Sequence, residues 1–375
     1  MRNFVMTSES VTEGHPDKLC DQISDAVVDA YLAAGVQAGV SAECAIATGV
    51  TFLSVRAGAE APLDLAALTR RVMAEAGYPP ETGGAPTVML DLARAPELET
   101  GGRARHMVSA FGYACAETPT AMPYPIEAAH RIAAALDAAR RAGRLPWLAP
   151  DAQAQVAVTF RERRAVALGA VALSFGHDGM PGEEAAREEL MTEAVRPALA
   201  ELGVQPDDAT RVILFPAHGR AGPQVHSGLT GRKSADDAYG AFIRRSGPAL
   251  SGKDPSRIDR IAAYAARQAA RAVVAAGLAE ECEAQLSYIV GDAAPVTVEV
   301  DTHGSGRTED ATLSRRLREV CDFRVGAIAE RMGLWTLPAE RGGRFYRDLA
   351  HYGHMGRDDL APPWEDVDEL AARLA

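Results

Sequence analysis

Residues 14–18 (Gly-His-Pro-Asp-Lys) place an imidazole, a carboxylate and an ammonium group at four consecutive positions. Lys18 is one of three lysines among the 39 basic residues, and Lys233 and Lys253 also lie in turns rich in glycine, proline or aspartate. A compact ammonium on a flexible stem cannot be exchanged for a planar guanidinium without changing its contacts. We therefore interpret the three lysines as sites that require ammonium and that together bind a polyanion. Chance placement on solvated turns is the alternative.

Carboxylates accompany these cations. Asp254 and Asp259 follow Lys253, and Glu43 is a carboxylate on an otherwise apolar segment. Glycine next to lysine lets the backbone approach a phosphate chain, and Mg²⁺ binds one or two carboxylates together with phosphate oxygens. The residues therefore predict a Mg²⁺-dependent site for a polyphosphate compound. Neither a Walker A motif nor a Gly-x-Gly-x-x-Gly after a strand is found, which disfavours the common nucleotide-binding folds.

Composition limits the class of protein. A chain of 375 residues exceeds one hydrophobic core, so two or three domains are expected. A formal net charge of −12 argues against nucleic acid or an anionic membrane as partner. The sequence shows no signal-peptide core and no apolar run of membrane-spanning length. Five scattered cysteines without paired spacing favour reduced thiols and exclude a Cys-x-x-Cys zinc site. We expect a cytoplasmic protein.

Hydrophobic periodicity predicts the elements that position these residues. A helix begins at Pro16, with Asp17 and Lys18 in its first turn, and ends at Gly35. The other predicted helices are 63–76, 125–142, 183–202, 258–277, 310–321 and 324–332, and the predicted strands are 41–53, 87–90, 153–160, 165–174, 211–215, 283–290 and 295–301. Residues 93–105 lack periodicity and are interpreted as a mobile connection. Strands and helices thus alternate in three similar units, so the predicted fold class is α/β, each unit a small sheet with helices on one face.

Several long motifs resemble one family. Residues 7–26 (Thr-Ser-Glu-Ser-Val-Thr-Glu-Gly-His-Pro-Asp-Lys-Leu-Cys-Asp-Gln-Ile-Ser-Asp-Ala) are very similar to the N-terminal signature of S-adenosylmethionine synthetases, also called methionine adenosyltransferases. Later segments match as well: 145–151, 228–233, 251–267 and 352–357. The resemblance implies three interleaved α/β domains in a pseudo-threefold arrangement, here at 1–97, 103–220 and 222–360. It also implies a homodimer or larger homo-oligomer with active sites between subunits.

The resemblance further implies a reaction in which the sulfur of methionine attacks C5′ of ATP and expels triphosphate, which is then hydrolysed to pyrophosphate and phosphate. Such a leaving group must be stabilised by fixed charge. By the match, His15, Lys18 and Lys253 would be catalytic, with His15 at the breaking C5′–O bond. The positions expected to bind ATP or its phosphates are His15, Lys18, Asp151, Arg232, Lys233, Ala249 and Lys253.

The same match implies the metal ligands. Asp17 and Asp259 would hold Mg²⁺, with two ions expected, and Glu43 would bind an activating K⁺.

This chain departs from the family where methionine and adenine should bind. Arg56 and His226 occupy positions of carboxylates that grip the methionine ammonium, and His106 occupies the position of an aspartate. The altered pocket positions are Arg56, His106, His226 and Arg257. Gln153 replaces a lysine, residues 219–221 lack an adenine-stacking aromatic, and the gating loop before His106 is short. Cations where an ammonium should sit weaken binding in a desolvated pocket.

Three hypotheses follow. The chain makes S-adenosylmethionine from ATP and methionine; or it uses the same ATP chemistry on a sulfur nucleophile that lacks the ammonium; or it is a non-catalytic subunit that pairs with an active synthetase. Retention of Lys18, Lys233 and Lys253 argues against the last, because a pseudoenzyme need not keep them. The residues expected to bind phosphate and metal are retained in the sequence, whereas several of those expected to bind methionine and adenine are replaced.

Overall fold

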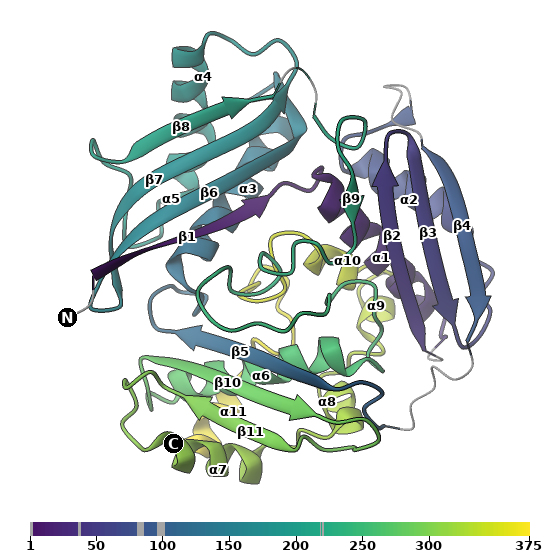
Figure 1. Cartoon of the computed structure of the whole chain (residues 1–375), viewed down its shortest axis with the longest axis vertical. Coiled ribbons are helices and arrows are strands. Elements are labelled where there is room, and N and C mark those ends of the chain that lie inside the picture. The colour runs from purple at the N-terminus through teal and green to yellow at the C-terminus, as the bar shows by residue number, and fades with distance from the viewer. Residues whose placement is uncertain (1–2, 37–38, 81–85, 96–101, 218, 220) are drawn as a thin grey trace.

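The computed structural model describes residues 3–36, 39–80, 86–95, 102–217, 219 and 221–375. Its strands form three separate sheets (Figure 1). Sheet A has the order β1-β6-β7-β8, and its strands are Asn3–Val11, Leu148–Arg161, Arg164–His177 and Arg211–Pro216. All its neighbours are antiparallel except β7 and β8, which are parallel.

Sheet B has the order β4-β3-β2-β9, with strands Thr87–Arg94, Val50–Ala57, Val40–Ala47 and Gly228–Leu229. The prediction of one strand over 41–53 was wrong, because β2 and β3 are the two arms of a hairpin. Thr48 and Gly49 form its turn with φ of 32° and 81°. Apolar residues continue through both arms, so periodicity alone did not mark the turn.

Sheet C has the order β11-β10-β5, with strands Thr297–Asp301, Glu281–Tyr288 and Val108–Cys115. The sequence did not predict β5, which is rich in small residues. One of them, Gly112, is required by close packing: a Cβ there would lie 2.0 Å from the backbone carbon of Ala266 in the helix above. Strand β1 was also missed, because polar residues fill its second half.

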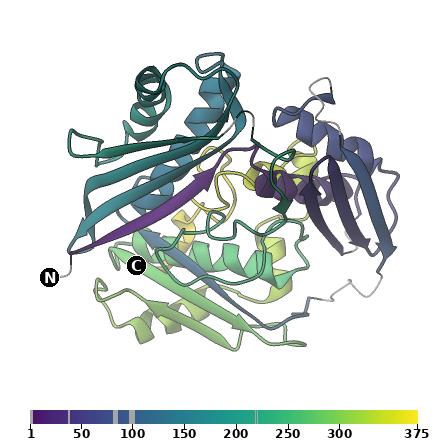
Figure 2. The same ribbon diagram turned by 45° about the horizontal axis from the view of Figure 1, so that its top comes forward.

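Each sheet is covered by one helix of 18 residues. Helix α1 (Pro16–Ala33) packs on β2, α3 (Tyr124–Arg141) packs on β6, and α6 (Ile258–Ala275) packs on β5. Figure 2 shows α1 and α2 (Leu65–Glu75) on the inner side of sheet B, facing the rest of the molecule. The predicted fold class, three small sheets with helices against one face of each, is confirmed.

Shorter helices complete the fold. Helix α4 (Glu183–Leu190) runs through a π-helical turn (Met191–Val195) into α5 (Arg196–Leu199), in place of one long predicted helix. The remaining helices are α2 (Leu65–Glu75), α7 (Asp310–Val320), α8 (Val325–Arg331), α9 (Leu337–Glu340), α10 (Tyr346–Leu349) and α11 (Asp368–Leu374). None of the helices among the described residues combines the length and the apolar character that crossing a membrane requires. All five cysteines are free and buried.

Each sheet contains one strand that comes from a distant part of the chain. Strand β1 from the N-terminus joins sheet A, β5 joins sheet C, and β9 joins sheet B. Each of these strands hydrogen-bonds to a sheet whose other strands lie more than thirty residues away along the sequence. The boundaries 1–97, 103–220 and 222–360 remain a prediction.

Candidate active site

His15 begins helix α1, and both its hydrogen bonding and its protonation state can be assigned. It is the N-cap residue, with φ −64° and ψ 132°, and its Nδ1 accepts a hydrogen bond from Asp17 N at 3.2 Å. Burial, followed by the positive charges of Lys233 and other cations, lowers the pKa of His15 to about 3. The imidazole is therefore neutral at physiological pH. Because Nδ1 accepts, the proton resides on Nε2, which is left as a hydrogen-bond donor.

The loop before His15 is fixed against the strand that carries Asp151. Thr12 Oγ1 donates to Pro150 O at 2.6 Å, and Tyr78 OH donates to Gly14 O at 2.8 Å. A Cβ at Gly14 would lie 2.5 Å from Pro150, so only glycine allows this approach. The glycine of the Gly-His-Pro-Asp-Lys motif thus positions His15 beside Asp151.

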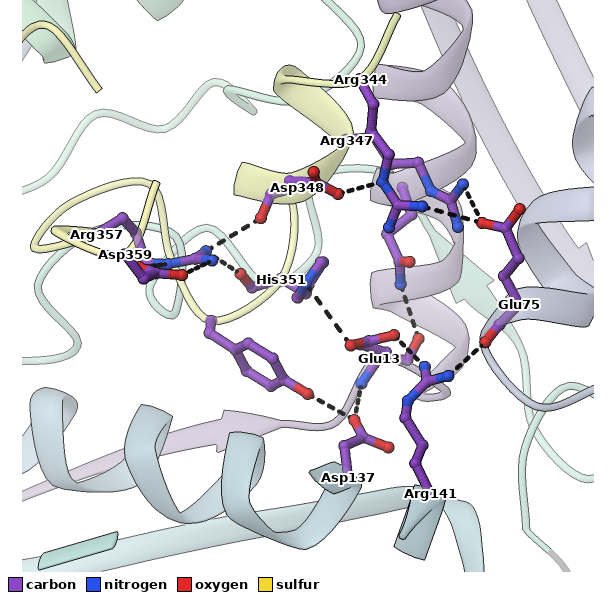
Figure 3. Close-up of polar contacts among 12 residues, drawn as sticks. Glu13, Glu75, Asp137, Arg141, Arg344, Arg347, Asp348, His351, Arg357 and Asp359 are labelled. Carbon is purple, nitrogen blue, oxygen red and sulfur yellow. Dashed lines mark hydrogen bonds and ion pairs between the residues drawn. The ribbon is translucent and has the colours of Figure 1, made fainter. Parts of the chain in front are cut away.

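A polar network of side chains surrounds Glu13 of the same loop (Figure 3). Glu13 pairs with Arg141 of α3, and Glu13 N donates to Asp137 Oδ2 at 2.8 Å. Glu75, at the end of α2, pairs with Arg347 at 2.5 Å. The network therefore connects the His15 loop, α2, α3 and the C-terminal segment, and it involves no predicted site residue.

Asp137 is the centre of this support, with a side chain 3% exposed. Its Oδ2 accepts from Glu13 N and from Tyr352 OH (2.6 Å), and Oδ1 accepts from Arg140 at 2.9 Å. In Asp137→Asn the amide nitrogen cannot replace an accepting oxygen, so we expect a loss of about 1–3 kcal/mol in the free energy of unfolding. Urea unfolding measures this loss. Tyr352→Phe, which removes one of these hydrogen bonds, should cost about 0.5–1.5 kcal/mol, and an equal or larger loss in that variant would contradict the central role of Asp137.

His226 is 41% exposed, and its ring contacts Asp151. Its Nε2 is 2.7 Å from Asp151 Oδ2, and this hydrogen bond raises the pKa of His226. The His226 ring also meets the His15 ring edge to face, with centroids 5.2 Å apart. The structure thus brings together His15, Asp151 and His226 from three distant parts of the chain.

Asp17 and the 228–233 turn lie beside this cluster. Asp17 Oδ1 accepts from Leu229 N at 3.0 Å and lies 3.5 Å from the Arg232 guanidinium. Ala249 packs against Gly231, whose φ is +78° and at which a Cβ would lie 2.3 Å from the Ala249 methyl group. His15, Asp17, Asp151, His226 and Arg232 form what we call the histidine group.

The three lysines are each paired with a carboxylate. Lys233 Nζ is 2.9 Å from Glu9, and Lys253 Nζ is 3.0 Å from Asp259. Lys18 is 1% exposed and bonds to both Asp21 (2.9 Å) and Asp237. Burial by itself would lower the pKa of Lys18, but the two carboxylates outweigh burial and raise it.

This pairing changes the interpretation of Lys18. Its ammonium is compensated inside the protein, so the structure does not place it at the accessible surface of the site. A direct phosphate contact would require the Lys18–Asp237 pair to separate. Asp21, at i+3 on α1, could have been suspected from helical spacing, whereas Asp237 lies 219 positions away and has no sequence signal.

A second set, the lysine group, consists of Lys253, Arg257, Asp259 and His106. Asp259 Oδ2 lies 3.8 Å from Arg257 and 4.0 Å from His106 Nε2. Burial, then Arg257, lowers the pKa of His106, against the opposing effect of Asp259. Lys253 forms an isolated bridge with Ser41, directly across the hairpin from Arg56.

Arg56 and Glu43 lie on the open face of sheet B. Arg56 is 54% exposed and lies 3.5 Å from Asp91. Glu43 is exposed on β2, in register with Ser54. Gln153 lies in β6 between Val11 and Ser174. Arg220 and residues 96–101 of the predicted gating loop lie outside the described residues.

The histidine and lysine groups are separate. Among the residues that the structure describes, hydrogen bonds and ion pairs join members within each group and none joins a member of one directly to a member of the other. Asp17 and Asp259, the predicted Mg²⁺ ligands, therefore stand in different groups. Each supplies a single carboxylate, which suits Mg²⁺ held by one carboxylate with phosphate oxygens. Glu43 likewise offers one exposed carboxylate, which by itself is an incomplete K⁺ site.

Three family models match the chain in succession. They are the S-adenosylmethionine synthetase N-terminal domain over residues 3–91, the central domain over 102–219 and the C-terminal domain over 220–366. The S-adenosylmethionine synthase of Parasynechococcus marenigrum is 43% identical over 400 residues, which cover 98% of this chain and 95% of the relative. That of Prochlorococcus marinus strain MIT 9313 is 43% identical and covers 100% and 97%, and that of Synechococcus elongatus is 40% identical and covers 98% and 96%. The chain belongs to the S-adenosylmethionine synthetase family.

Proposed function

We propose that this chain transfers the adenosyl group of ATP to methionine and forms S-adenosylmethionine. The observation that carries the proposal is His15, a neutral imidazole 12% exposed, beside the cations Arg232 and Lys233; its Nε2–H has no hydrogen-bond partner among the described residues. The family membership supplies the reaction class, and the geometry supplies a donor where a phosphate oxygen must be stabilised.

The bonds change as follows in the proposed reaction. The methionine sulfur donates an electron pair to C5′, the C5′–O bond breaks, and its electron pair remains on the triphosphate oxygen. His15 Nε2–H donates a hydrogen bond to that oxygen, and Arg232 and Lys233 offset the remaining charge. Fixed donors of this kind favour the transition state because charge develops there and not in the substrate. Water then cleaves the triphosphate into pyrophosphate and phosphate.

Asp17 and Asp259 are the proposed Mg²⁺ ligands, and bound Mg²⁺ would supply neutralisation of phosphate charge. Glu43 is the proposed K⁺ ligand. Lys18 is proposed to act as a positioning residue that orients α1, and hence His15, through Asp21 and Asp237. Direct phosphate binding is assigned to Lys233 and Lys253, which are 15% and 13% exposed.

A complete site is proposed to form between two copies of the chain. Two observations support this: among the described residues no hydrogen bond or ion pair joins the histidine group to the lysine group of one chain, and the open face of sheet B carries large exposed apolar side chains. Phe52 and Met89 are register partners on that face, 43% and 54% exposed, and Leu229 is 49% exposed beside them. Glu43 and Arg56 share the face, so a partner covering it would also approach these residues.

Co-expression of two inactive variants tests the shared site. His15→Asn disables the histidine group and Lys253→Ala the lysine group. If each site takes one group from each subunit, a mixed dimer has one intact site, and random pairing restores about a quarter of the wild-type activity. Failure to restore activity in purified mixed dimers would contradict a site shared between subunits.

The nucleophile is proposed to be methionine although Arg56 and His226 replace carboxylates. Each of these cations lies beside a carboxylate, Arg56 by Asp91 and His226 by Asp151, so negative charge remains available for an ammonium. The second candidate is a thioether acid without the amino group. It is favoured by the exposure of Arg56, which is 54% exposed and donates to Asp91 through Nη2, so that other N–H groups of the guanidinium face solvent and can bind a carboxylate ligand.

Purified protein with ATP, Mg²⁺ and K⁺ distinguishes the candidates. Methionine and 4-(methylthio)butanoate are compared as nucleophiles, with the sulfonium product and the phosphates identified by mass spectrometry. Turnover with methionine supports the proposal. Turnover only with the deaminated acid supports the second candidate. A protein that is inactive alone, yet raises the activity of an added synthetase, would be the non-catalytic subunit.

Lys253→Arg tests whether ammonium is required at this site. The substitution keeps the charge, but the larger planar group cannot occupy the position where Lys253 meets Asp259. We expect kcat/KM for ATP to fall at least about tenfold, because small displacements of a phosphate-binding group are costly. Arg196→Lys, at a position 57% exposed and outside both groups, is the control and should keep the wild-type rate. An unchanged rate in Lys253→Arg would contradict the inference that this position requires an ammonium group.

A further inference from the structure

We infer that His15, Asp151 and His226 also form a binding site for a divalent transition-metal ion of the zinc class. One possible ligand atom from each residue lies within 4.8 Å of the other two. Among the described residues, this is the one group of three or more His, Cys, Asp or Glu side chains with that spacing. The site differs from the proposed Mg²⁺ positions, and its existence does not depend on the proposed function.

Three independent features of the backbone fix the ligands. His15 is the N-cap of α1, Asp151 lies in β6 with a side chain 6% exposed, and the amide of His226 donates to Gly222 O at 3.1 Å. His226 is 41% exposed, so an ion can reach the cluster from its side. Two ligands are thus held rigidly and the third stands at the entrance.

The donor set selects the metal. Two imidazole nitrogens and one carboxylate oxygen suit Zn²⁺, Co²⁺ and similar ions, whereas Mg²⁺ prefers oxygen ligands. With zinc bonds of about 2.0–2.2 Å in a tetrahedral site, the ligand atoms lie roughly 3.3–3.6 Å apart. The wider separations in the cluster, up to 4.8 Å, must therefore close, whereas the 2.7 Å hydrogen bond between His226 Nε2 and Asp151 must open and lose its proton to solvent. The exposed His226 turn can supply this movement. Three protein ligands leave a fourth position open for water or another ligand.

A second carboxylate is available to orient His15. Metal-bound histidines usually donate their other ring N–H to a carboxylate or carbonyl. Asp17 Oδ2 lies 3.9 Å from His15 Nδ1. If Nε2 binds the ion, the proton moves to Nδ1 and can be donated to Asp17 in place of the present bond from Asp17 N. The metal would then bind His15 Nε2, the atom whose N–H donates a hydrogen bond in the proposed reaction. Metal binding and adenosyl transfer therefore exclude one another at one site.

The test measures metal binding without nucleotide. Untagged protein is titrated with Zn²⁺ in the presence of a chromophoric chelator, and with Co²⁺ while the visible spectrum is recorded. We expect one ion per chain and a Co²⁺ spectrum typical of nitrogen and oxygen ligands. In His226→Gln, affinity should fall by about tenfold or more, since loss of even an outer contact has effects of that size.

His303→Asn is the matched control. His303 stands outside the cluster in a turn with φ +51°, a conformation that asparagine tolerates. Its Zn²⁺ affinity should equal that of the wild type. Circular dichroism checks folding, and Asp151→Asn replaces His226→Gln should the latter fail to fold. Absence of binding, equal affinity in His226→Gln and wild type, or an equal loss in His303→Asn would each overturn the inference.

Discussion

His15→Asn is expected to lower kcat by about 10²–10³, the usual effect of removing one donor from a developing oxyanion. Asparagine is a good N-cap residue, so α1 should still begin at the same position. The substitution therefore removes the imidazole N–H while retaining the local structure. The measurement is the steady-state rate of S-adenosylmethionine formation at saturating ATP and methionine.

His15→Ala separates the two roles of the residue. It removes the donor and also the cap, so the free energy of unfolding should fall by about 0.5–2 kcal/mol relative to His15→Asn. The two variants should nevertheless share the same loss of kcat. If His15→Asn keeps wild-type kcat and His15→Ala does not, the residue serves only to begin the helix, and its proposed contact with the leaving group is wrong.

The pH profile offers an independent check on His15. Because burial and neighbouring cations lower its pKa to about 3, His15 stays neutral from pH 5 to pH 9. No limb of the kcat profile in this range should therefore disappear in His15→Asn. A limb near the ordinary histidine pKa that is lost in this variant would show that His15 titrates during catalysis.

Glu365→Gln is expected to destabilise the protein by about 3–5 kcal/mol, because it removes one partner of a buried ion pair. Arg267 and Glu365 are 0% and 3% exposed and lie 2.9 Å apart. Arg267 also donates to the carbonyl oxygens of Tyr113 and Thr120 at 2.6 and 2.7 Å. The pair thus joins α6, β5 and the C-terminal segment, and the uncompensated guanidinium left in the variant has no access to water.

The measurement is the midpoint of urea unfolding. Glu369→Gln, an exposed position in α11, is the control and should change stability by less than about 0.5 kcal/mol. A similar midpoint for both variants would contradict the assigned role of Glu365.

The same pair predicts an acid limit of stability. Burial alone would raise the pKa of Glu365, but the charge of Arg267 outweighs burial and lowers it. A carboxylate with a lowered folded-state pKa contributes stability above its unfolded pKa, and this contribution is lost as pH falls through the folded value. The difference in the free energy of unfolding between wild type and Glu365→Gln should therefore be largest at neutral pH and decrease in strongly acidic solution.

Much of the fold followed from local patterns. Helix α1 begins at Pro16 as predicted, because proline at the first helical position and His15 before it are local signals. The long helices α3 and α6 and the antiparallel pair β6–β7 were also predicted to within a few residues, apart from the longer ends of β6 and β7. Strands β1 and β5 were not, since they pair with strands far away along the chain. The hairpin β2–β3 was missed because apolar residues continue through both of its arms and do not mark the turn.

For the candidate site, the sequence by itself determined the residue types: a histidine at a helix start, rare lysines in turns, and carboxylates near them. Only the tertiary structure determined which partner each of these charged or titratable residues pairs with. Lys18 is compensated by Asp237 across 219 positions, and His226 meets Asp151 across 75. It also decided which of these residues are joined by hydrogen bonds and ion pairs, in the histidine group and in the lysine group. The physical reason is that burial and pairing set the state of an ionisable group, and both depend on residues that chain folding brings together.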